Sequence, residues 1–77
     1  MISYPVRMMA ADQGMVLVAF PDVPEAIAAG ETEDEALSKA PEVLEVILDY
    51  YVAEGLPLPE PSDICGAPKV ATHRFSL

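Results

Sequence analysis

Carboxylates are the most abundant side chains in this chain that could do chemistry, because Asp and Glu account for 13 of its 77 residues. Where several carboxylates converge from strands and a helix, they can hold the metal ions of a two-metal nuclease. A transition-metal site would need more ligands than His73 and Cys65, each of which is the only residue of its kind. The acidic residues are therefore the first group to test for a catalytic role.

The placement of the acids along the chain does not favour a nuclease. The predicted first strand, 2–10, has no acid, and the predicted last strand, 70–77, has His73 and Arg74 instead. The acids of the predicted helix fall on its solvated face. The glycines are isolated and form no phosphate-binding loop. We therefore expect no catalytic residue, no metal site and no cofactor, and a residual metal-dependent nuclease is the third hypothesis.

The net charge of −9 is the strongest bulk signal in the composition. The sequence has only four basic residues, and they are scattered along it: Arg7, Lys39, Lys69 and Arg74. A uniformly acidic surface repels phosphate backbones, so we expect no direct nucleic-acid binding. It attracts a basic protein partner and speeds the encounter at low salt. Acidity that only maintains solubility is the alternative.

Three strands are predicted before the helix. Residues 2–10 alternate apolar and polar side chains, and 11–14 form a turn. Residues 15–20 are apolar throughout, which indicates a central strand covered on both faces. The helix would cover one face, and a second copy of the chain could cover the other, so we expect a homo-oligomer. Pro21 and Pro24 are predicted to end this strand and turn the chain into a short third strand, 25–29.

The helix has clear sequence signals at both ends. Thr32 is the predicted N-cap, with Glu35 completing a capping box, and Gly55 is the predicted C′ residue after a helix that runs to about Glu54. Pro41 is predicted to bend this single helix without dividing it. A period of 3.6 residues separates an apolar stripe of Ala36, Leu37, Ala40, Val43, Leu44, Ile47, Leu48 and Tyr51 from a wet face of Glu35, Ser38, Glu42, Glu45 and Asp49.

The order of these elements predicts an α+β domain of the form β-β-β-α-β. It comprises a three-stranded antiparallel meander, one long helix packed on one face, a proline-rich connector at 56–61, a loop and a final strand at 70–77. A chain of this length makes a single domain. No apolar run approaches the roughly 20 residues that a membrane span requires. The single Cys65 excludes an internal disulfide and suits a cytoplasmic protein.

Several segments, in order, resemble the N-terminal domain of HicB-type antitoxins. They are Tyr4-Pro5-Val6, then Phe20-Pro21-Asp22-Val23-Pro24-Glu25-Ala26 after a strand that begins near Gly14, then Gly30-Glu31-Thr32 before Glu35-Ala36-Leu37, and finally the segment 55–62 with its prolines. Each motif alone is weak, but the ordered set is fairly specific. The resemblance covers essentially all of residues 1–77.

The resemblance implies a partial ribonuclease H-like domain that no longer cleaves RNA. Such a domain binds a small basic HicA-like toxin, which is similar to a double-stranded RNA-binding domain and degrades mRNA with a histidine. The antitoxin covers that histidine. Full-length members of the family also have a C-terminal ribbon-helix-helix or helix-turn-helix segment that binds the operator. That segment would begin where this sequence stops, at Leu77, so operator binding does not follow from the resemblance.

The leading hypothesis is therefore a non-catalytic antitoxin domain that neutralises a HicA-like toxin by steric occlusion. The predicted partner-binding residues are Asp22, Glu25 and Glu31, with Phe20 and Pro24 as apolar anchors. The second hypothesis is a stand-alone adaptor or regulatory module that binds another protein through the same surface.

Overall fold

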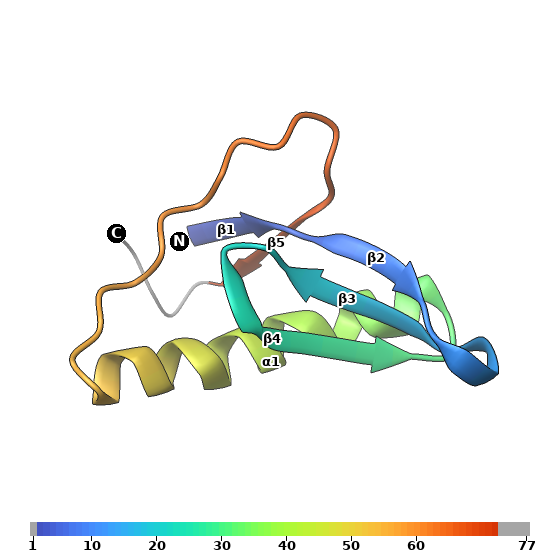
Figure 1. Ribbon diagram of the computed structural model, residues 1–77, viewed down its shortest axis with the longest axis horizontal. Coiled ribbons are helices and arrows are strands. Elements are labelled where there is room, and N and C mark those ends of the chain that lie inside the picture. Colours follow the sequence, from blue (N-terminus) through green and yellow to red (C-terminus); the bar gives the residue numbers. More distant parts are fainter. Residues whose placement is uncertain (1, 73–77) are drawn as a thin grey trace.

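The computed structural model describes residues 2–72, and it confirms the predicted α+β fold (Figure 1). The elements are β1 (Ile2–Pro5), β2 (Arg7–Ala10), the 3-10 turn η1 (Asp12–Gly14), β3 (Val16–Phe20), β4 (Val23–Gly30), α1 (Glu33–Ala53) and β5 (Lys69–Thr72). A three-stranded antiparallel sheet, in the order β2-β3-β4, packs against α1, and β5 pairs with β1.

The predicted first strand is in fact two strands that belong to different sheets. β1 pairs with β5, whereas β2 pairs with β3. The break lies at Val6, whose side chain is buried and whose amide donates to the Pro68 carbonyl at 2.9 Å. Pro5 has no amide hydrogen to continue a ladder. The prediction of one continuous strand over 2–10 was therefore wrong. The Val6 amide donates to Pro68, far along the chain, in place of a neighbouring strand of the three-stranded sheet.

The turn between β3 and β4 is tighter than predicted. Only Pro21 and Asp22 lie outside the strands, and β4 begins at Val23 and contains Pro24. The prediction that Pro24 keeps the chain out of a strand was wrong. β4 is an edge strand, where a residue without an amide hydrogen need not break a ladder. The pairing register with β3 shifts between Ala19 and Phe20, which accommodates this irregular start.

The helix ends are formed as their sequence signals indicate. The Thr32 hydroxyl accepts from the Glu35 amide at 3.1 Å, and Gly55 has a φ of 69° after the last turn. The Glu35 carboxylate accepts from the amide of Glu31 at 3.4 Å, and not from the Thr32 amide that a capping box requires, so only the Thr32 half of the predicted box is formed. Pro41 lies within one uninterrupted helix, as predicted.

The core lies between α1 and the strands, on the sheet face that Val18 and Ala28 share. The fully buried helix residues recur every four positions: Ala36, Ala40, Leu44 and Leu48. Gly30 lets β4 pass directly into the start of α1, because a Cβ atom there would lie 2.5 Å from the backbone nitrogen of Ala36. The end of β4 therefore packs directly against the backbone of the first turn of the helix.

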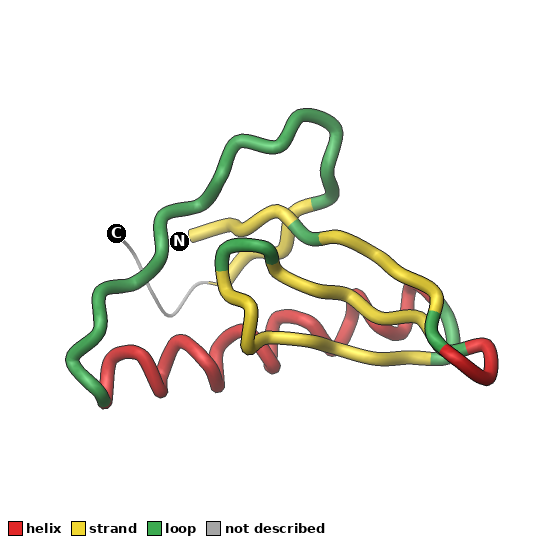
Figure 2. Tube along the Cα trace, viewed as in Figure 1, coloured by secondary structure: helices red, strands yellow, loops and turns green. Residues whose placement is uncertain are grey.

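The segment after α1 returns across the molecule as a long loop to β5 (Figure 2). The Tyr4 hydroxyl donates to the Pro59 carbonyl at 2.6 Å and so holds the proline-rich part against β1. The predicted last strand is observed as β5, and its remainder, 73–77, lies outside the described residues. Glu45, predicted on the wet face, is half-buried and accepts from the Thr72 hydroxyl at 2.6 Å, because β5 packs on that side of α1.

Candidate partner-binding surface

Four of the five residues predicted to bind a partner lie on β4 or at its ends. Asp22 immediately precedes the strand, Pro24 and Glu25 lie near its start, and Glu31 immediately follows it. Phe20 is different, because it is only 1% exposed and belongs to the core beneath the turn. The polar members therefore lie at the two ends of one strand, Asp22 and Glu25 at its start and Glu31 after its end, and Phe20 has almost no surface to offer a partner.

Asp22 fastens the returning loop to the β3–β4 turn. Its carboxylate accepts from the Ser62 amide at 2.8 Å and from the Ser62 hydroxyl. Burial, reinforced by the nearby negative charge of Asp22, raises the pKa of Tyr4 above its ordinary value of 10.0. Asp22 is thus half-buried and engaged within the domain, although it lies at the start of the candidate surface.

Glu25 connects β4 with the last turns of the helix. Its carboxylate accepts from the Tyr51 hydroxyl at 2.8 Å, and this hydrogen bond is the main cause that raises the pKa of Tyr51 above 10.0. A phenol that donates to a carboxylate resists deprotonation because the phenolate would face a like charge. The Glu25 side chain remains exposed, so it can still face a partner.

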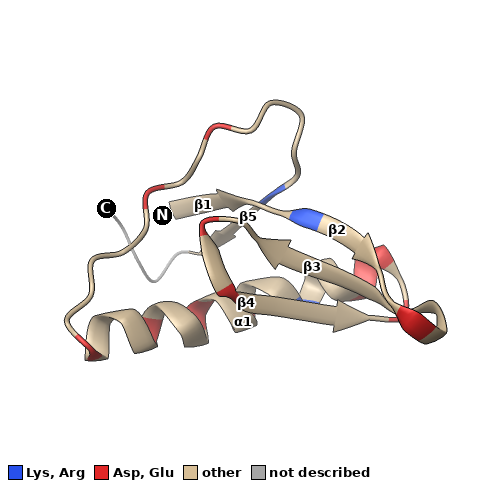
Figure 3. Cartoon of the chain, in the orientation of Figure 1, with Lys and Arg blue, Asp and Glu red and all other residues tan. Residues whose placement is uncertain are grey.

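The other end of β4 is followed, after two residues, by the acidic first turn of α1. Glu31, Glu33 and Asp34 are all exposed there, within the first residues after the strand and at the positive end of the helix dipole. Figure 3 shows acidic residues at this end of the molecule and along α1, whereas the basic residues are few. The described residues contain only three basic side chains, Arg7, Lys39 and Lys69. The Lys39 ammonium is paired with the Glu35 carboxylate at 3.3 Å.

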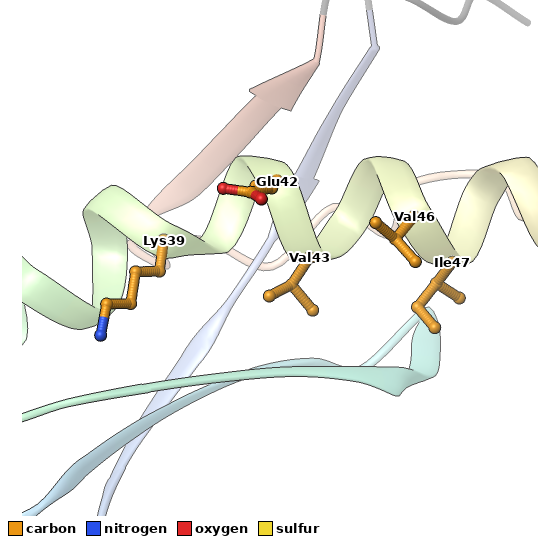
Figure 4. A pocket seen from close by; sticks show the side chains of 5 residues that line it. All are labelled: Lys39, Glu42, Val43, Val46 and Ile47. Carbon is orange, nitrogen blue, oxygen red and sulfur yellow. The ribbon is translucent and has the colours of Figure 1, made fainter.

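An open groove of about 420 Å³ lies on α1 on the side where β4 runs (Figure 4). It is lined by Lys39, Glu42, Val43, Val46 and Ile47, so its floor is apolar and its rim is charged. The predicted apolar stripe included Val43 and Ile47 but not Val46, which is 61% exposed. An apolar residue outside the buried stripe was the sequence signal that could have identified this groove.

The remaining chemistry of the described residues is limited. Within residues 2–72, no three His, Cys, Asp or Glu side chains gather in a way that could hold a metal ion. Cys65 is exposed and unbridged.

Within residues 2–72, no helix has both the length and the apolar character that crossing a membrane requires.

Comparison with known proteins identifies the family. Residues 3–69 match the family described as HicB_like antitoxin of bacterial toxin-antitoxin system. The chain is 40% identical over 60 residues to Antitoxin HicB 1 of Photorhabdus laumondii, covering 75% of this chain and 39% of that protein. It is also 40% identical over 60 residues to Antitoxin HicB of Escherichia coli K12, covering 75% and 44% respectively. The chain thus spans about two fifths of the length of these relatives.

Solved structures share the fold. One chain of a "HicA3 and HicB3 toxin-antitoxin complex" matches with a TM-score of 0.73 and 25% identity, over 92% of this chain and 98% of that one. The N-terminal domain of the Burkholderia pseudomallei antitoxin HicB matches with a TM-score of 0.67 and 19% identity, over 90% and 93%. On the extent of the family match and the identity to its curated members, the chain belongs to the HicB-like family of antitoxins of bacterial toxin-antitoxin systems.

Proposed function

We propose that this domain binds a small basic HicA-like toxin and neutralises it by covering its active surface. The observation that carries the proposal is the acidic border of β4, formed by Glu25 near one end and by Glu31, Glu33 and Asp34 beyond the other. A related chain has been solved as part of a HicA3 and HicB3 complex, which supports a toxin of the same kind as the partner.

The proposed mechanism is inhibition by occlusion, without a chemical step. The net charge of −9 attracts a basic toxin and speeds the encounter, and this attraction weakens as salt screens it. Once bound, the antitoxin occupies the surface that RNA would contact, and its carboxylates compete there with phosphates. The family membership supports a regulatory, non-enzymatic role. The same acidity is the reason that we do not assign DNA binding to this segment.

The test is a pair of charge reversals with equal effect on net charge. Glu25→Lys with Glu31→Lys alters the border of β4, whereas Glu54→Lys with Glu60→Lys alters exposed acids elsewhere and serves as the control. Binding to the HicA-like toxin of the same organism is measured by calorimetry at low salt, with inhibition of RNA cleavage alongside. We expect the first pair to weaken binding at least tenfold more than the control pair.

Two results would contradict this proposal in different ways. Equal losses in the two pairs would show that only overall charge matters and that the border of β4 is not the site. A toxin that neither binds the unaltered domain nor loses RNA cleavage in its presence would refute the function itself. Circular dichroism of all variants establishes that the fold is retained.

A further inference from the structure

β4 is the longer of the two edge strands of the three-stranded sheet. It has eight residues, and within residues 2–72 no strand pairs with its outer edge. An edge strand presents alternate amide and carbonyl groups that point away from its sheet and can pair with another extended chain. Proteins that recognise partners in this way take their affinity from main-chain hydrogen bonds and their specificity from pockets for alternate side chains.

Apolar surface is available on both faces of any strand that would be added beside β4. On the helix side lies the groove with Val43, Val46 and Ile47. On the opposite face lies Ile27, which is 50% exposed, because Ala28 faces the helix and successive strand residues alternate between faces. A partner strand could therefore bury its side chains on both faces of the extended sheet.

The charges around this edge favour one kind of occupant. Glu25, Glu31 and Glu42 surround the apolar surface, while the nearby Lys39 is already paired with Glu35. A second copy of the chain would bring another −9 charges and like-charged borders to the same place. A basic segment with alternating apolar residues complements both the charge and the two apolar faces.

We propose that β4 binds an extended segment of the basic toxin as an added strand, with alternate apolar side chains entering the groove on α1 and covering Ile27. Basic residues of that segment lie against Glu25, Glu31 and Glu42. This inference rests on the proposed function, and it assigns the mode of recognition: the toxin extends the sheet of the antitoxin. The acidic residues then define the ends of the site and the groove defines its centre.

Amide hydrogen exchange of the domain, free and bound to the HicA-like toxin of the same organism, tests the added strand. We expect alternate amides in 25–29 to exchange at least tenfold more slowly in the complex, while those of β2 remain unchanged. A second copy at the site would instead protect the same amides in the free domain, increasingly with concentration, and would overturn the proposal.

Two matched valines on α1 test the groove independently of backbone pairing. Val46 is 61% exposed and lines the groove, whereas Val52 is 57% exposed and does not line it. Val46→Ser should weaken toxin binding about tenfold, because the lost apolar burial corresponds to about one to two methyl groups. Val52→Ser should change it less than about twofold. Both positions are too exposed for either change to disturb the core.

The outcomes separate this inference from the proposed function. If the toxin binds and is inhibited but the β4 amides gain no protection and Val46→Ser matches Val52→Ser, the added strand is refuted and the antitoxin function stands. If the toxin does not bind the unaltered domain, both fail. Protection of β2 in place of β4 would also refute the added strand.

Discussion

The two edges of the three-stranded sheet differ in length, in charge and in what the chain places beside them. β2 has four residues and carries the basic Arg7, and the returning loop lies beside its start. There the Val6 amide bonds the Pro68 carbonyl, and a smaller hollow is lined by Arg7, Met8, Pro21 and residues 64–68. β4 is twice as long, is bordered by acids and adjoins the apolar groove of α1.

This difference shows how a domain of limited size can use its two edges for separate purposes. Residues 64–68 lie beside the start of β2, and the chain continues from them into β5, which pairs with β1. The described chain adds no strand to β4, although an exposed edge of that length invites pairing. An edge that is long, acidic and flanked by apolar surface is suited to a basic partner, and this is why we place the toxin there.

The largest expected effect comes from breaking the junction between β4 and α1. Gly30→Ala places a Cβ atom against the backbone of Ala36, so the strand or the helix must shift. We expect a loss of about 1–3 kcal/mol in the free energy of unfolding, typical of overpacking. Urea denaturation measures it. Ala29→Ser, on the opposite face of β4, is the control and should cost less than about 0.5 kcal/mol; equal costs would show that the junction tolerates a side chain.

A smaller effect is expected where the returning loop is fastened. Ser62→Ala removes the hydroxyl that donates to Asp22 but keeps the amide donor. The expected loss is about 1 kcal/mol of unfolding free energy, the usual contribution of one such hydrogen bond. Toxin affinity should change less than about twofold, because Ser62 belongs to the loop and not to the β4 edge. A tenfold loss of affinity would place the toxin on the loop side of the molecule.

The smallest expected effect is on how the free energy of unfolding depends on pH, to which the hydrogen bond from Tyr51 to Glu25 contributes. In the folded domain the pKa values of Tyr4 and Tyr51 are both raised above 10.0. Just above pH 10, the folded domain therefore keeps phenol protons that the unfolded chain loses. This stabilisation is fully present below pH 10 and is lost as the pH rises through the raised pKa values. Tyr51→Phe should make the decline above pH 10 shallower, as measured by urea unfolding between pH 8 and about 11. An unchanged decline would show that the bond does not form in solution.

Local sequence signals predicted the two ends of the helix. The break in the first strand and the partial burial of Glu45 depend on contacts between residues far apart in the sequence, which the sequence did not reveal. Thr32 and Gly55 mark the ends of α1 through chemistry that involves only neighbouring residues. The break at Val6 depends on Pro68, and the position of Glu45 depends on Thr72, both from the far end of the chain. The sequence predicted Asp22 and Pro24 in a turn and Glu25 at the start of the next strand. Only the strand order showed that four of the five predicted partner-binding residues lie on or beside one edge strand, with which no further described strand pairs on its outer side.

A toxin that binds along β4, as we propose, and one that binds along β2 would contact different backbone amides of the antitoxin. Intermolecular nuclear Overhauser effects in the complex distinguish the two most directly, with a deuterated, nitrogen-labelled antitoxin domain and an unlabelled toxin. Binding along β4 predicts that amide protons within 25–29 show contacts to backbone protons of one extended toxin segment, in the alternating pattern of paired strands. Contacts confined to the amides of 7–10, or to helix residues away from the groove, would contradict it.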